Sequence, residues 1–239
     1  MPLHLAHGDP AALRARCEVA TVRTTRENET AYESGAVVPD GQWRRMTAAE
    51  VKTASAPRRP LDSIMVEIVR PPFQEGQALE DLTRLLGDPD AVYLGQAPAK
   101  PGMVTTTDNY EDGRLIGLHL DNWDKLRCSD RHTGRRRLAI NLGPGTRYII
   151  LGALDAQTVC RAVQGAGHEH RYPHTNDFRA YVAAGYPIRI IRIRLEPGDG
   201  YIAPTEYLLH DGSTEDQDQP SAAAFWLGRF PRGLLPSLV

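Results

Sequence analysis

The chain has 239 residues, 24% of them charged, and a formal net charge of -2. It is long enough to bury a sizeable core, and its near-neutral charge gives no overall attraction to nucleic acid or to an anionic membrane surface. No eighteen apolar residues run together, so the sequence predicts no transmembrane helix.

Targeting and cysteine patterns point to a reducing compartment. Residues 1–17 lack a basic stretch followed by a long apolar segment, so we expect no signal peptide. Cys17, Cys128 and Cys160 lie far apart, and no CxxC pair occurs. The sequence therefore predicts neither a zinc ribbon nor a disulfide framework, and we expect a cytoplasmic protein.

Residues 1–104 are predicted to form a helical or mixed N-terminal part. Asp9 as N-cap and Pro10 at the first helical position predict a short helix that ends near Cys17. A polar, proline-punctuated stretch follows, in which "PDGQWRRMTAAEVKTA" predicts a turn and a second short helix. "SIMVEIVR" predicts a strand, and the leucine spacing of "GQALEDLTRLLGD" predicts an amphipathic helix.

From about residue 104 onward, the sequence favours β-strands. Short β-rich runs separated by Gly, Pro and Asp turns predict a β-sandwich or jelly roll. Residues 155–186 interrupt them, with helical patterns at both ends and a histidine-bearing loop between. We therefore expect one α+β domain, residues 1–239, in which helices precede a β core at residues 105–239. The β-rich runs are "RLIGLHLDNW", "RRLAINLGPG", "TRYIILGA", "IRIIRIRLEP", "GYIAP", "EYLLHD" and "AAAFWLGRF".

The first of these runs places a histidine and an aspartate two positions apart. Alternate side chains of a strand share a face, so Leu115, His119 and Asp121 are expected to point the same way. An imidazole and a carboxylate on one face can bind the same metal ion. The spacing alone carries little weight, because His7 and Asp9 have it too, at the predicted start of a helix.

A second histidine follows a strand–turn–strand segment near the C-terminus. In "RLEPGDGYIAPTEYLLHDGS", the turn at "PGD", the strand "GYIAP" and the turn at Pro204 lead to His210. This arrangement can bring His210 beside His119 and Asp121. Two histidines and one carboxylate form a facial triad, the open-sided site of non-heme Fe(II) oxygenases.

Together these segments resemble the double-stranded β-helix core of the Fe(II)/2-oxoglutarate-dependent oxygenases. The resemblance is carried by "HLD" at 119–121, by "PGDGYIAPTEYLLHD" and by the terminal strand "SAAAFWLGRF". It covers residues 105–239 apart from the interruption. By this resemblance, His119, Asp121 and His210 would be catalytic iron ligands, and the protein would use Fe(II), 2-oxoglutarate and O₂.

The same resemblance implies a basic residue, on a strand after the second histidine, that binds the distal carboxylate of 2-oxoglutarate. Arg229 is the candidate, and strand alternation independently puts it on an apolar face with Phe225 and Leu227. A buried guanidinium needs an anionic partner, which a dicarboxylate supplies. This sequence departs from the common family pattern in having Pro231 where a hydroxyl side chain is usual.

Other polar residues have competing interpretations. His168, His170 and His174 form a rival ligand set, but their loop lacks a strand that would hold a ligand, so a solvated loop or substrate lid is favoured. The arginine run at 135–137 is interpreted as a solvated strand edge. The candidate substrate contacts are Asn122, Trp123 and Asn141.

The leading hypothesis is an oxygenase that hydroxylates a small molecule, such as an amino acid or a natural-product intermediate, and forms succinate and CO₂. Two alternatives stay open. A cupin-type metalloenzyme without 2-oxoglutarate fits the spacing of Gly113 and His119, although Asp121 stands where cupins usually have a second histidine. In the other alternative, a metal-free jelly-roll binding module, the same polar residues merely line a pocket.

Overall fold

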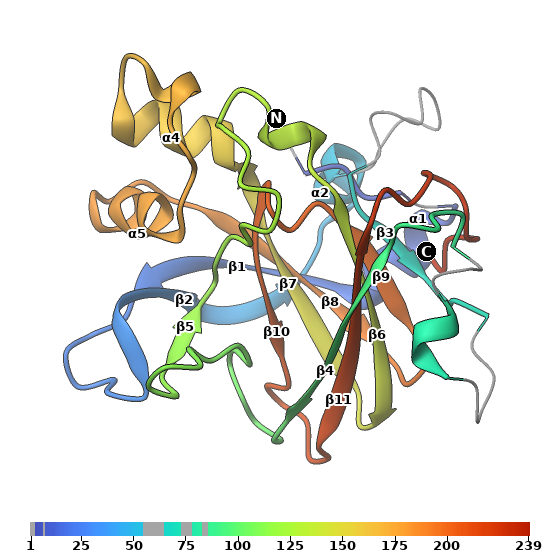
Figure 1. Ribbon diagram of the computed structural model, residues 1–239. Helices are drawn as coiled ribbons and strands as arrows, with labels where there is room; N and C mark the ends of the chain where they lie inside the picture. The colour runs from blue at the N-terminus through green and yellow to red at the C-terminus, as the bar shows by residue number, and fades with distance from the viewer. Residues whose placement is uncertain (1–2, 7, 55–64, 73–77, 83–85) are drawn as a thin grey trace.

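Two β-sheets packed together form the centre of the molecule (Figure 1). The computed structural model describes residues 3–6, 8–54, 65–72, 78–82 and 86–239. One sheet has six strands in the order β10-β7-β8-β1-β2-β5, and the other has five in the order β3-β9-β6-β11-β4. The six-stranded sheet contains β1 (Cys17–Thr24), β2 (Tyr32–Arg45), β5 (Leu115–Gly117), β7 (Arg147–Asp155), β8 (Arg189–Leu195) and β10 (Leu208–Ser213). The five-stranded sheet contains β3 (Glu67–Val69), β4 (Val92–Ala99), β6 (Arg136–Pro144), β9 (Gly200–Ala203) and β11 (Ser221–Gly228).

From β4 onward the chain passes repeatedly between the sheets. β4, β6, β9 and β11 belong to the five-stranded sheet, while β5, β7, β8 and β10 belong to the six-stranded one. Apolar side chains of both sheets, among them Ala139, Ile149 and Ile193, meet in one buried cluster. Removing these inward faces from water stabilises the sandwich. The predicted α+β class with a sandwich-like core is confirmed.

Helices flank the sheets near the N-terminus and between β7 and β8. α1 (Pro10–Arg16) begins as expected, since the Asp9 carboxylate accepts a hydrogen bond from the N–H of Ala11, and α2 (Ala48–Ala54) follows β2. Between β7 and β8 lie α4 (Ala156–Gln164), η4 (His168–His170) and α5 (Thr175–Ala183), and α4 packs on α5 (Figure 1). Among the described helices, none has the length and hydrophobicity to cross a membrane.

The N-terminal part contains more strand than the sequence predicts. β1 pairs with β2 on one side and with β8 on the other, and it buries Cys17 and Val19. Since β8 is distant in sequence, local patterning does not reveal this pairing. Of the predicted amphipathic helix, the described residues show the 3₁₀ turn η2 (Leu79–Asp81) followed by a helical Leu82. Parts of the predictions lie outside the described residues: His7, Ser63, Ile64, and residues 73–77 and 83–85.

The end of β5 closes the six-stranded sheet into a barrel-like shape. β5 ends at Gly117, whose φ is 70°, and a Cβ there would lie 2.5 Å from the Val37 carbonyl oxygen, so glycine is required. Beyond it, an isolated antiparallel bridge joins His119 to His210 of β10, which lies at the other end of the strand order. The predicted strand therefore stops at Gly117 and does not continue to residue 121, and a cross-strand bridge, not strand alternation, places His119.

Candidate metal centre

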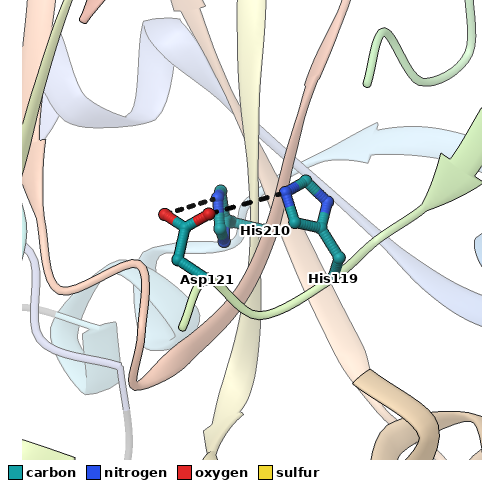
Figure 2. A group of neighbouring side chains, drawn as sticks. All are labelled: His119, Asp121 and His210. Carbon is teal, nitrogen blue, oxygen red and sulfur yellow. Dashed lines mark ion pairs between the residues drawn. The ribbon is translucent and has the colours of Figure 1, made fainter. Parts of the chain in front are cut away.

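The three predicted ligands lie together in the interior (Figure 2). One potential ligand atom of each of His119, Asp121 and His210 lies within 4.8 Å of the other two. His119 Nε2 is 3.9 Å from Asp121 Oδ1, and His210 Nε2 is 3.7 Å from Asp121 Oδ2. All three side chains are buried. The chain therefore has a buried His-Asp-His group that can hold a metal ion.

Backbone hydrogen bonds hold the two histidines opposite each other. The N–H of His119 donates to the His210 carbonyl oxygen, and the N–H of His210 donates back to that of His119, both at 3.0 Å. Directly opposed residues of an antiparallel pair stand on the same face, and the imidazole centroids are 4.5 Å apart. Asp121 lies on the following turn, where its N–H donates to Thr205 at 3.2 Å. Main-chain pairing thus positions all three ligands.

The hydrogen bonds of the imidazole rings turn Nε2 toward the centre of the group. His119 Nδ1 lies 3.0 Å from the Gly117 carbonyl oxygen, and His210 Nδ1 lies 3.2 Å from that of Leu208. An N–H at each Nδ1 donates to these oxygens and leaves the Nε2 lone pair free. His210 Nε2 is buried without a hydrogen-bond partner. The backbone therefore favours the tautomers that a metal ion requires.

Arg137 of β6 stabilises the ionised form of Asp121. Its Nη2 lies 2.7 Å from Asp121 Oδ2. Burial opposes ionisation of Asp121, but Arg137 and the two histidines outweigh it and lower the pKa of Asp121 to about 2. Burial lowers the pKa of His210 to about 3. At neutral pH both groups are therefore in the protonation state that binds a metal ion.

Asp211, the residue after His210, supports His119. Its Oδ2 is 3.7 Å from His119 Nδ1, and its Oδ1 accepts hydrogen bonds from the N–H and the hydroxyl of Thr107 at 3.2 and 2.8 Å. Burial disfavours protonation of His119, but Asp211 outweighs it and raises the pKa of His119 above its ordinary value. A carboxylate behind a metal-binding histidine also orients the ring.

We expect metal affinity to depend on pH through His119. A metal ion binds the neutral imidazole, so it must displace the proton that the raised pKa retains on this ring. Affinity should fall about tenfold per pH unit below that pKa and level off above it. Calorimetric titration with Zn(II) in buffers of different ionisation enthalpy measures the protons released. Absence of proton release at about pH 6 would contradict the expectation.

A buried ion pair joins the two turns that carry the ligands. Arg131 and Glu206 are each 1% exposed, and Arg131 Nη1 lies 3.4 Å from Glu206 Oε2. Arg131 also donates to the main-chain oxygens of Asp121 and Glu206, at 2.6 and 2.7 Å. One guanidinium group therefore ties the turn that follows Asp121 to the turn that precedes His210.

Arg229 does not occupy the buried position that alternation predicts. β11 ends at Gly228, and the side chain of Arg229 is exposed. Its Nη1 donates to the Thr133 carbonyl oxygen at 3.4 Å, and its main-chain N–H donates to Asp88 Oδ2 at 2.5 Å. Because this contact takes the chain out of the strand, the alternation that buries Leu227 does not extend to Arg229. The expected burial of Arg229 is wrong.

The three candidate substrate residues have different surroundings. Trp123 is 50% exposed and lines a cavity beside the metal centre. Asn122 is exposed, and its Oδ1 accepts a hydrogen bond from Arg131. Asn141 is buried, and its amide donates to the Gly145 carbonyl oxygen. Asn141 thus stabilises the turn between β6 and β7, whereas Trp123 presents its indole to the cavity.

The rival histidines lie outside the metal centre. The His170 side chain is 74% exposed, and His168 Nδ1 lies 3.1 Å from the Gly165 carbonyl oxygen. His174 caps α5, where its Nδ1 accepts a hydrogen bond from Asn176. Within the part of the chain that the structure describes, the group at 119, 121 and 210 is the only one that meets the geometry for a metal ion.

Two adjoining pockets, here called the inner and the outer part of one cavity, lie beside the metal centre. His210 lines the inner part, Trp123 lines the outer part of about 210 Å³, and both parts share Arg137, Arg147 and Phe225. Arg147 of β7 is 5% exposed, and its Nη1 is buried without a hydrogen-bond partner. The other terminal nitrogen of this group, Nη2, donates to Thr106 Oγ1 at 3.5 Å. Leaving the buried Nη1 donor unsatisfied is costly.

Sequence reasoning missed both cavity arginines. The arginine run predicts a solvated edge, yet Arg136 is buried and Arg137 pairs with Asp121, so that interpretation is wrong. Arg147 opens an apolar strand and shares a face with Ile149, which is buried. An arginine on the apolar, buried face of a strand is the signal by which Arg147 could have been found.

Similarity to known proteins does not identify this centre. No protein-family model matches the chain, and no curated protein matches its sequence. The described residues form a buried His-Asp-His group that can hold a metal ion, beside a cavity that is lined by Arg147, whose Nη1 is buried without a hydrogen-bond partner among them.

Proposed function

We propose that the protein is an Fe(II)- and 2-oxoglutarate-dependent oxygenase that hydroxylates a small molecule. The observation that carries the proposal is Arg147, a buried cation whose Nη1 has no hydrogen-bond partner among the described residues, in the same cavity as the ligand His210. A metal ion at the triad and a guanidinium group in the same cavity match the two ends of a 2-oxo dicarboxylate. In this proposal Arg147 takes the role that the sequence assigned to Arg229.

The strand register supports the spacing between these two groups. Gly212 of β10 is paired with Ile149 of β7, and a Cβ at Gly212 would lie 2.6 Å from Arg147 Nη2. The guanidinium group therefore lies against Gly212, two residues along the strand from His210, a separation of about 7 Å. The five-carbon chain of 2-oxoglutarate can bridge such a separation. Glycine at 212 leaves the room that the guanidinium group needs.

Arg137 offers a second hydrogen-bond donor, which suits the carboxylate of the cosubstrate that lies at the metal ion. Arg137 Nε is also buried without a hydrogen-bond partner, while Nη2 of the same residue pairs with Asp121. Arg137 lines the cavity next to the metal centre. We propose that it keeps Asp121 ionised and donates to a carboxylate that lies at the metal. Two arginines that line the same cavity favour a dianion over a monocarboxylate.

The strand order is compatible with the fold of this family. The four strands β4, β6, β9 and β11 lie in one sheet, and their partners β5, β7, β8 and β10 lie in the other. We propose that these strands form a double-stranded β-helix, with α4 and α5 inserted between β7 and β8. His119 and Asp121 then lie in the segment just after β5, and His210 lies on β10.

Bound Fe(II), 2-oxoglutarate and O₂ supply the oxidation: the cosubstrate loses CO₂ to become succinate, and one oxygen atom enters a C–H bond of the substrate. The chain's own residues bind and orient. His119, Asp121 and His210 hold the metal ion, and Arg147 binds the distal carboxylate. The buried surroundings of the triad exclude bulk water from the reacting groups.

Anaerobic titration with 2-oxoglutarate tests the proposal. Protein that carries Fe(II) should develop a weak visible absorption band as the cosubstrate binds, and succinate should form after O₂ is admitted. Succinate as titrant is the control, because it lacks the 2-oxo group that chelates. Metal binding without any effect of 2-oxoglutarate would favour the cupin-type alternative, and absence of metal binding would leave only the binding module.

A further inference from the structure

The outer part of the cavity is apolar and aromatic on its walls. About 210 Å³ in volume, it is lined by Leu94, Pro98, Trp123 and Phe225, with Arg137 and Arg147 toward the metal centre. Such a mixture of apolar walls with a few polar groups is typical of small-molecule sites. The chemistry of this lining determines which part of a substrate the outer part of the cavity accepts.

Trp123 is held in place although half of it faces solvent. Its relative exposure is 50%, which leaves much apolar area in water. Yet its neighbours are pinned: the N–H of Asp124 donates to Glu206 Oε1 at 2.6 Å, and Arg131 donates to Asn122 Oδ1 at 2.8 Å. The buried Arg131–Glu206 pair thus holds the residues on both sides of Trp123, which lines the cavity. A partly exposed aromatic side chain is a common ligand contact.

Phe225 supplies a second aromatic surface. It lines both parts of the cavity, and the guanidinium carbon of Arg137 lies 5.3 Å from its ring centroid. Trp123 and Phe225 come from different segments, the turn after Asp121 and β11. Two segments that are far apart in the sequence therefore each contribute an aromatic side chain to the cavity lining.

In the proposed function, the two carboxylates of the cosubstrate pair with the arginines that line the cavity. Arg137 pairs with Asp121, and the proposed dicarboxylate engages Arg147 and the remaining donor of Arg137. The other charged side chain that lines the outer part is Asp108, which is exposed and negative. An anionic group on the substrate would meet this carboxylate without a free cation among the lining residues.

We infer that the primary substrate places an uncharged, flat aromatic group in the outer cavity, against Trp123 and Phe225. The inference rests on the proposed function, because it assigns Arg147 to the cosubstrate. The aromatic group stacks on the indole, and its substituent reaches inward toward the metal centre.

Three probes of one carbon skeleton test this inference: 2-naphthol, 2-naphthoate and decahydro-2-naphthol. Calorimetry measures their binding to protein loaded with Zn(II), which prevents turnover, in saturating 2-oxoglutarate. We expect 2-naphthol to bind most tightly. Trp123→Ala should weaken it about tenfold, and Trp123→Phe should restore most of the loss. Tyr172→Ala is the matched control, since Tyr172 is 54% exposed and does not line this cavity.

Four results would overturn the inference. Equal binding of the saturated alcohol would remove the aromatic requirement, and tighter binding of 2-naphthoate would show an anion site. An unchanged affinity in Trp123→Ala, or no saturable binding of 2-naphthol, would remove the site itself. The 2-oxoglutarate isotherm recorded in the same experiment reports on the proposed function separately.

Discussion

Asp121→Ala should lower the affinity for Fe(II) or Co(II) by more than about 100-fold. Asp121 is the anionic member of the triad, and its pKa of about 2 keeps it charged at every working pH. Without the carboxylate, two imidazoles remain as ligands beside the cation of Arg137, whose Nη2 lies 2.7 Å from the lost oxygen. Absorption of Co(II) in the visible range measures both affinity and coordination geometry.

His170→Ala is the control for this prediction, because His170 belongs to the rival set and its side chain is 74% exposed. We expect its Co(II) affinity and spectrum to match those of the unmodified protein. The opposite pattern, with loss in His170→Ala and retention in Asp121→Ala, would move the metal site to the loop at residues 168–174. Far-ultraviolet circular dichroism establishes that both variants fold.

Arg147→Met should weaken 2-oxoglutarate about 100-fold while Fe(II) affinity stays unchanged. The guanidinium group is proposed to bind the distal carboxylate, and methionine retains the apolar contacts of its stem without the charge. The anaerobic visible band measures the affinity. Gly212→Ala should also weaken 2-oxoglutarate, since a methyl group there would lie 2.6 Å from Arg147 Nη2.

The melting temperature distinguishes a loss of 2-oxoglutarate binding from unfolding of the variant. In the described structure, Arg147 Nη1 is buried without a hydrogen-bond partner, so its replacement by an apolar side chain removes an uncompensated charge. The melting temperature of Arg147→Met should therefore be equal to or above that of the unmodified protein. Arg229→Met is the matched control and should bind 2-oxoglutarate normally, because Arg229 is exposed. If Arg229→Met alone loses the cosubstrate, the assignment based on the sequence is the right one.

The strands of the core could be predicted because their signal is local. The runs at β6, β7, β8, β9 and β11 show β-rich composition between turn residues, and each forms a strand. β1 and β2 were not predicted, because their pairing with distant segments outweighs their weak local preference.

The role of Arg229 shows where alternation fails. Strand parity is valid only while the strand continues, and β11 ends one residue before Arg229. The contact of its N–H with Asp88 Oδ2, far away in the sequence, is invisible in the local pattern. The same limit applies at Gly117, where β5 ends with a φ of 70°, before His119.

The sequence by itself determined the chemistry of the triad, because a histidine and a carboxylate two positions apart, followed by a strand-borne histidine, can be read from residue types and short spacings. Only the tertiary structure decided which arginine faces that triad. Arg137 lies on β6 and Arg147 on β7, and their position at the cavity depends on the register of β6 with β11 and of β7 with β10. Such register is set by packing between segments far apart in the chain, and a shift of one residue would turn either arginine to the opposite face.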